Sequence, residues 1–195
     1  MTRSSLVSVV FPSPYLAVLV LVSAACSPVA TFDDAVEGSG GTAKVTLIDN
    51  TRWEMNGAET DPFIDERPET VECPDWAFLE EYGTFEVDTG GCDYLSVSQP
   101  SLSAAKAGDT VHISLWHDVL FSAEPGTGHA AIVLGADLLW EKTFEIPSYP
   151  RAYSSKILLE KDYPEGSPVL FHLHNHGSNY WRLLSVSLES GQDGD

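Results

Sequence analysis

The chain has 195 residues, of which 29 are acidic and 10 are basic, so its formal net charge at pH 7 is −19. This charge argues against binding to nucleic acid or to anionic membrane surfaces, because like charges repel one another. With 43% hydrophobic residues, the chain can form one domain with its own apolar core once an N-terminal segment is set aside.

Residues 1–25 have the order of a secretory signal peptide. A basic start at Arg3 precedes an apolar stretch, and small residues stand directly before Cys26. The densest apolar part, residues 15–22, is too short to span a bilayer. We therefore predict that residues 1–25 are removed during export.

The segment LVSAAC, residues 21–26, resembles the lipobox of bacterial lipoproteins. The resemblance implies that the thiol of Cys26 is diacylated and that Cys26 becomes the first residue of the mature chain. Because Ser27, and not Asp, follows this cysteine, the resemblance also implies an anchor in the outer membrane, with the domain outside the cytoplasm. Ordinary signal cleavage after Ala25 is the alternative, since Ser23 and Ala25 are both small.

Once Cys26 is set aside, Cys73 and Cys92 remain as an even pair in an oxidising compartment. They therefore predict one disulfide, which would stabilise the fold by about 3 kcal/mol on the chain-entropy model. Two unpaired buried cysteines are the alternative.

Small, polar and Gly-rich residues follow Cys26, so residues 26–41 are predicted to be a flexible tether that carries the lipid. Residues 42–188 are predicted to form the domain, and residues 189–195 a disordered tail. Many acidic residues gather between Glu59 and Glu81. A solvated acidic surface is the favoured interpretation, and calcium binding is the alternative, although no D-x-D-x-D-G loop is present.

Short runs rich in β-branched and aromatic residues fill the predicted domain, separated by Gly, Pro, Asp and Asn. This spacing predicts an all-β sandwich. In two of the runs, residues 110–117 and 168–175, apolar side chains alternate with others, so one face of each strand belongs to the core. The runs cover residues 43–48, 51–55, 84–88, 93–98, 110–117, 129–134, 137–144, 154–160, 168–175 and 181–188.

The segment PDWAFLEEY, from Pro74 to Tyr82, predicts the one short helix, with Gly83 as its C-terminal stop. Three tryptophans, Trp53, Trp76 and Trp181, are assigned to the core because large aromatic side chains usually lie there.

Residues 84–188 resemble the galactose-binding-like jelly rolls that serve as carbohydrate-binding modules. The resemblance rests on TFEVDTGGCDYLSVSQPSL, AGDTVHISLWH and PVLFHLHNHGSNYWRLLSVSL, and above all on the N-H-G-x-N-x-W element in the last of these. It implies a jelly-roll β-sandwich and a carbohydrate as the class of ligand.

All six histidines lie in the second half of the chain, and three of them alternate in the segment H-L-H-N-H. On a strand, His172, His174 and His176 would point the same way. Two imidazoles at this spacing can chelate zinc or copper, and His112 or His117 on an adjacent strand would supply a third ligand.

The favoured interpretation of the same face is a hydrogen-bonding surface for a sugar. Trp116 would contact the apolar face of a sugar ring, and His112, His172 and His174 would contact its hydroxyls. Asn179 and Tyr180 would contribute from the rim of the sheet.

Catalytic motifs such as G-x-S-x-G, the P-loop, H-E-x-x-H and C-x-x-C are absent from the sequence, so no catalytic residue is assigned. We predict a cell-envelope lipoprotein whose module binds a carbohydrate or another surface ligand, touches the membrane only through its lipid and does not bind nucleic acid. No cofactor is required, although zinc, copper and calcium remain alternatives. A His-ligated metal protein or small metalloenzyme is the second hypothesis, and a structural envelope component without a small ligand is the third.

Overall fold

The computed structural model describes residues 44–191, which form eleven β-strands and one 3₁₀ turn. In chain order these are β1 (Lys44–Thr46), β2 (Glu54–Met55), η1 (Asp75–Ala77), β3 (Phe78–Glu81), β4 (Thr84–Asp88), β5 (Tyr94–Pro100), β6 (Thr110–His117), β7 (Gly126–Leu134), β8 (Asp137–Ile146), β9 (Arg151–Leu158), β10 (Pro168–Asn175) and β11 (Tyr180–Glu189).

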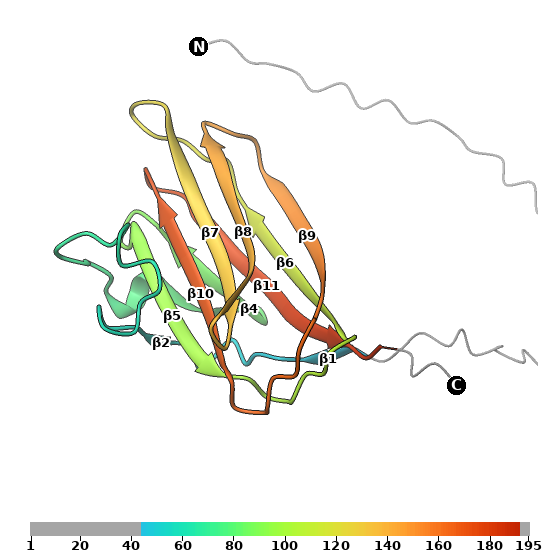
Figure 1. The fold of residues 1–195 in the computed structure, drawn as a ribbon. Coiled ribbons are helices and arrows are strands. Elements are labelled where there is room, and N and C mark those ends of the chain that lie inside the picture. Colours follow the sequence, from blue (N-terminus) through green and yellow to red (C-terminus); the bar gives the residue numbers. More distant parts are fainter. Residues whose placement is uncertain (1–43, 192–195) are drawn as a thin grey trace, which may run out of the picture. The chain divides into compact units, whose positions relative to one another are not determined.

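The strands form two antiparallel sheets that lie face to face (Figure 1). Sheet A has the order β3-β4-β11-β6-β9, with β1 paired to the far half of β11, and sheet B has the order β2-β5-β10-β7-β8. This arrangement confirms the predicted all-β jelly-roll sandwich, and each predicted run overlaps a strand.

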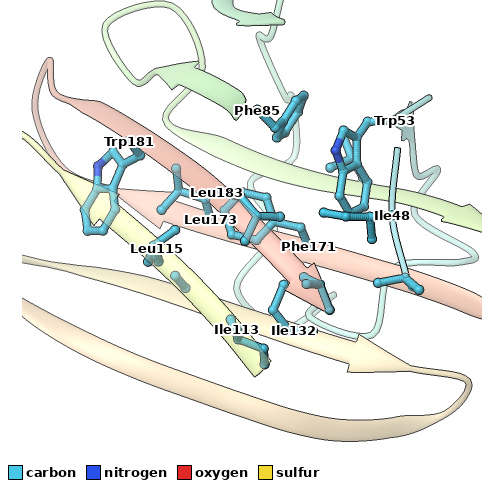
Figure 2. Close-up of a cluster of buried hydrophobic side chains, with 14 of the residues drawn as sticks. Ile48, Trp53, Phe85, Ile113, Leu115, Ile132, Phe171, Leu173, Trp181 and Leu183 are labelled. Atoms are coloured by element: carbon cyan, nitrogen blue, oxygen red, sulfur yellow. The ribbon is translucent and has the colours of Figure 1, made fainter. Parts of the chain in front are cut away.

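The core lies between the sheets, where alternate side chains of both sheets meet (Figure 2). Ile113 and Leu115 come from β6 in sheet A, and Phe171 and Leu173 come from β10 in sheet B; all four are almost completely buried. The side chains between them therefore point away from the core, on the outer faces of the sandwich. Two of the tryptophans assigned to the core, Trp53 and Trp181, lie in it as predicted.

The predicted helix over residues 74–82 is wrong. The chain makes only the turn η1 and then enters β3, which pairs with β4 as a hairpin. The two residues between these strands, Tyr82 and Gly83, have φ values of 52° and 80°. Positive φ at both central positions is the geometry that two-residue hairpins prefer, so Gly83 shapes a hairpin turn and not a helix end.

A disulfide joins Cys73 to Cys92, as predicted, and ties the segment before η1 to the loop between β4 and β5. The assignment of Trp76 to the core is wrong, because 62% of this residue is exposed. The indole of Trp76 packs against Gly91. A Cβ atom added at residue 91 would lie only 2.3 Å from the ring.

The predicted signal peptide, the lipid attachment at Cys26, the tether up to residue 41 and the last residues of the tail lie outside the described residues. Within residues 44–191, no helix has the length and apolar character needed to cross a bilayer.

Candidate functional site

Histidines from two neighbouring strands meet on the outer face of sheet B. His172 and His174 project from β10 on the side opposite to its core residues, as the alternation predicted. His129 on β7 lies directly opposite His174 in the register of the two strands. The outer face of sheet B therefore brings together side chains that are more than 40 residues apart in sequence.

The segment of residues 57–67, between β2 and η1, covers part of this face. Asp61 anchors the segment to sheet B. The carboxylate of Asp61 accepts hydrogen bonds from Arg67 Nη1 at 2.7 Å, Tyr94 Oη at 2.8 Å and Ser96 Oγ at 3.0 Å. Burial on its own would raise the pKa of Asp61, but these hydrogen bonds outweigh it and the pKa is lowered overall.

Phe63, from the same segment, stacks on His172 with a centroid distance of 4.2 Å and an interplanar angle of 15°. His172 is fully buried as a result. Burial, reinforced by the nearby His129, lowers the pKa of His172 to about 4, so its imidazole is neutral at pH 7. The Nδ1 atom lies 3.0 Å from the carbonyl oxygen of Leu95, which can only accept, so Nδ1 carries the proton.

One carboxylate oxygen is shared by three imidazoles. Glu66 Oε2 lies 3.2 Å from His129 Nδ1, 3.7 Å from His172 Nε2 and 3.7 Å from His174 Nδ1. A second carboxylate, Glu141 on β8, places its Oε2 atom 3.3 Å from His129 Nε2. Imidazoles and carboxylates in this arrangement can bind a transition metal or hydrogen-bond to a polar ligand.

This group opens into a hollow of about 350 Å³, called the polar hollow below. Every residue that lines it is polar: Glu66, Thr127, His129, Glu141, Thr143, His174 and His176. A larger hollow of about 470 Å³ lies beside the disulfide, but no histidine lines it. We take the polar hollow as the candidate site because it combines acceptors, donors and titratable groups.

Trp116 and His112, predicted to share a face with His172 and His174, do not do so. Both lie on β6 in sheet A and point away from the core, so they belong to the opposite surface of the sandwich. The guanidinium of Arg182 lies 5.7 Å from the Trp116 ring centroid, and His112 Nε2 lies 2.7 Å from a carboxylate oxygen of Glu189. The predicted joint site of these four residues is therefore not formed.

His117, predicted as an alternative metal ligand, faces the core at the end of β6. Its ring lies 4.9 Å from that of Trp181 and 5.7 Å from that of Phe144, and burial lowers its pKa. Asn179 is also buried, where its side-chain oxygen accepts a hydrogen bond from the backbone amide of Phe121 at 2.8 Å. His117 and Asn179 are therefore buried and do not line the polar hollow.

Tyr180, the other predicted rim residue, begins β11 in sheet A and is 47% exposed. The negative charge of Asp88 on the adjacent strand raises its pKa. Tyr180 therefore lies on sheet A, whereas the strands that line the polar hollow belong to sheet B.

No family model matches the sequence, and no curated protein matches it. The solved structures similar to it include a carbohydrate-binding module, CBM4, with 13% identity, 76% of this chain and 97% of that chain covered, and a TM-score of 0.44. The xylan-binding module CBM15 has 10% identity, 79% and 100% coverage and a TM-score of 0.43. The K3 cleaved adhesin domain of Lys-gingipain from Porphyromonas gingivalis has 12% identity, 76% and 100% coverage and a TM-score of 0.46. At these values the similarity assigns neither a ligand nor a site residue to this chain.

Proposed function

We propose that the chain is an exported, lipid-anchored β-sandwich module that binds a carbohydrate or a similar hydroxyl-rich ligand in the polar hollow. The observation that carries this proposal is the uniformly polar lining of a hollow whose volume, about 350 Å³, falls in the range of small-molecule sites.

The chemistry of the lining suits sugar hydroxyls, each of which both donates and accepts a hydrogen bond. The carboxylates of Glu66 and Glu141 accept, the hydroxyls of Thr127 and Thr143 do both, and the imidazoles do either according to tautomer. An apolar ligand would leave these groups unpaired, which costs binding free energy. Several of these polar groups lie on the paired strands β7 and β8, so ligand binding costs little conformational entropy.

A glycan-binding screen with matched variants tests this proposal. Thr143→Val keeps the shape of the side chain and removes one hydroxyl from the hollow, whereas Trp116→Ala removes the aromatic side chain on the opposite sheet. We expect Thr143→Val to weaken binding of the retained glycan by roughly tenfold, the value of one lost hydrogen bond, and Trp116→Ala to bind like the wild type.

Two results would contradict the proposal. One is that the wild-type protein retains no glycan. The other is that Trp116→Ala loses binding while Thr143→Val keeps it, which would place the ligand on sheet A.

A further inference from the structure

One ring nitrogen of His172, Nε2, faces the carboxylate of Glu66, which lines the polar hollow. The Nδ1–H of His172 donates to the Leu95 carbonyl, which leaves Nε2 as a lone-pair acceptor. Within residues 44–191 this buried Nε2 atom has no hydrogen-bond partner, and Glu66 Oε2 lies 3.7 Å from it. Two acceptors that face each other repel, so a cation between them would satisfy both.

A second imidazole converges on the same carboxylate. His129 Nδ1 lies 3.2 Å from Glu66 Oε2, and the ligand atoms of Glu66, His129 and His172 all lie within 4.8 Å of one another. A tetrahedral ion with bonds of about 2.0–2.2 Å separates its ligand atoms by about 3.3–3.6 Å. Small side-chain adjustments would therefore bring the three groups into a coordination shell.

Both imidazoles are already oriented by an oxygen acceptor on their other nitrogen. Glu141 Oε2 lies 3.3 Å from His129 Nε2, and the Leu95 carbonyl holds His172 Nδ1. In metal sites, ligating histidines almost always donate their second N–H to a carboxylate or carbonyl, which fixes the tautomer and the ring plane.

We propose that Glu66, His129 and His172 form a site for a divalent transition-metal ion of the zinc type. Two imidazoles and one carboxylate match the donor preference of such ions, whereas calcium and magnesium prefer an all-oxygen shell. Glu66 and His129 also line the polar hollow, so a fourth position of the ion would face that space. Zinc binding does not require a glycan, so this proposal goes beyond the function proposed above. Failure of the zinc proposal would leave the glycan proposal intact.

Zinc content and affinity of the full chain, purified without a polyhistidine tag, test the site. The protein is treated with chelator, titrated with Zn²⁺ by calorimetry in the presence of excess Ca²⁺, and dialysed before elemental analysis. Excess Ca²⁺ occupies weak sites on the acidic surface, so only a site with nitrogen donors keeps zinc. We expect about one retained Zn²⁺ per chain.

Variants identify the ligands. Glu66 is exposed and His129 is only partly buried, which limits damage to the fold, and Glu66→Gln and His129→Gln should each weaken Zn²⁺ binding by at least about tenfold. The matched control is His112→Gln, which removes a histidine with a carboxylate neighbour on the opposite sheet and should bind like the wild type. Near-UV circular dichroism checks that each variant is folded.

The proposal is overturned if the wild-type protein retains no Zn²⁺ in excess Ca²⁺. It is equally overturned if folded Glu66→Gln and His129→Gln bind Zn²⁺ as tightly as His112→Gln does.

Discussion

Asp61 is the residue that fixes the covering segment to sheet B. Its side chain is fully buried, and its partners include the charged Arg67 and the buried hydroxyls of Tyr94 and Ser96. The same segment supplies Phe63, which covers His172, and Glu66, which faces it. Asp61 thus positions the candidate site, although it is not among the residues that line the polar hollow.

Asp61→Asn should lower the free energy of unfolding by about 3 kcal/mol, because it removes one partner of a buried ion pair and leaves Arg67 uncompensated. Urea denaturation at pH 7 measures the change. Asp65→Asn, at an exposed acid of the same segment, should stay within about 0.5 kcal/mol of the wild type. Equal losses in the two variants would show that Asp61 does not anchor the segment.

The lowered pKa of Asp61 also predicts a pH dependence. A carboxyl whose pKa is lower in the folded state stabilises the fold above its unfolded pKa of about 3.9, and this stabilisation is lost as the pH falls through the folded value. The wild type should therefore lose more stability between pH 5 and pH 3 than Asp61→Asn does. Parallel urea midpoints for the two proteins over this interval would contradict the assignment.

At the scale of elements, the turn between β10 and β11 depends on Gly177. This residue has a φ of 97°, and a Cβ atom there would stand 2.2 Å from the carbonyl oxygen of Phe121. Gly177→Ala should destabilise the protein by about 1–3 kcal/mol or more, as a residue in strained backbone does. Gly57→Ala, where a Cβ atom meets nothing within 4 Å, is the control and should unfold near the wild-type urea midpoint.

The disulfide closes a loop with a sequence separation of 19 residues. Replacing both cysteines, Cys73→Ala with Cys92→Ala, should lower the free energy of unfolding by about 3 kcal/mol. Reduced wild-type protein should show a similar loss in the same denaturation experiment. An unchanged midpoint in both would mean that the bond adds nothing to stability.

Strands were predictable from the sequence because their signal is local. In β6 and β10 the apolar and polar side chains alternate, and side chains two residues apart on a strand lie on the same face of the sheet. Strand β4 was predicted, but β3 was not, because PDWAFLEEY has no such alternation. The turn that joins β3 to β4 needs a positive φ at Tyr82, which is rare for a tyrosine.

The site was less predictable because it depends on which strands are neighbours. His129 joins His172 only because β7 pairs with β10, whereas β6, with His112, belongs to the other sheet. Glu66 lies close to the histidines because long-range hydrogen bonds to Asp61 hold its segment in place. No local sequence pattern distinguishes Glu66 from the other acidic residues of that segment.

For the molecule as a whole, the lipid anchor at Cys26 remains a prediction of the sequence. Cys73 and Cys92 are joined to each other, so Cys26 is the one remaining thiol of the three cysteines. Cells fed a labelled fatty acid should label the wild-type protein in the membrane fraction, and Cys26→Ser should leave it unlabelled and released from that fraction. Equal labelling of the two proteins would refute lipidation at this residue.

The central claim is that Glu66, His129 and His172 form a metal site on the outer face of sheet B. Long-range ¹H–¹⁵N spectra of the imidazole rings, recorded during a Zn²⁺ titration, test it directly. We expect about one equivalent of Zn²⁺ to shift the ring nitrogens of His129 and His172 and to leave those of His112 and His117 unchanged. Shifts confined to His112 and His117, or no shift in any ring, would contradict it.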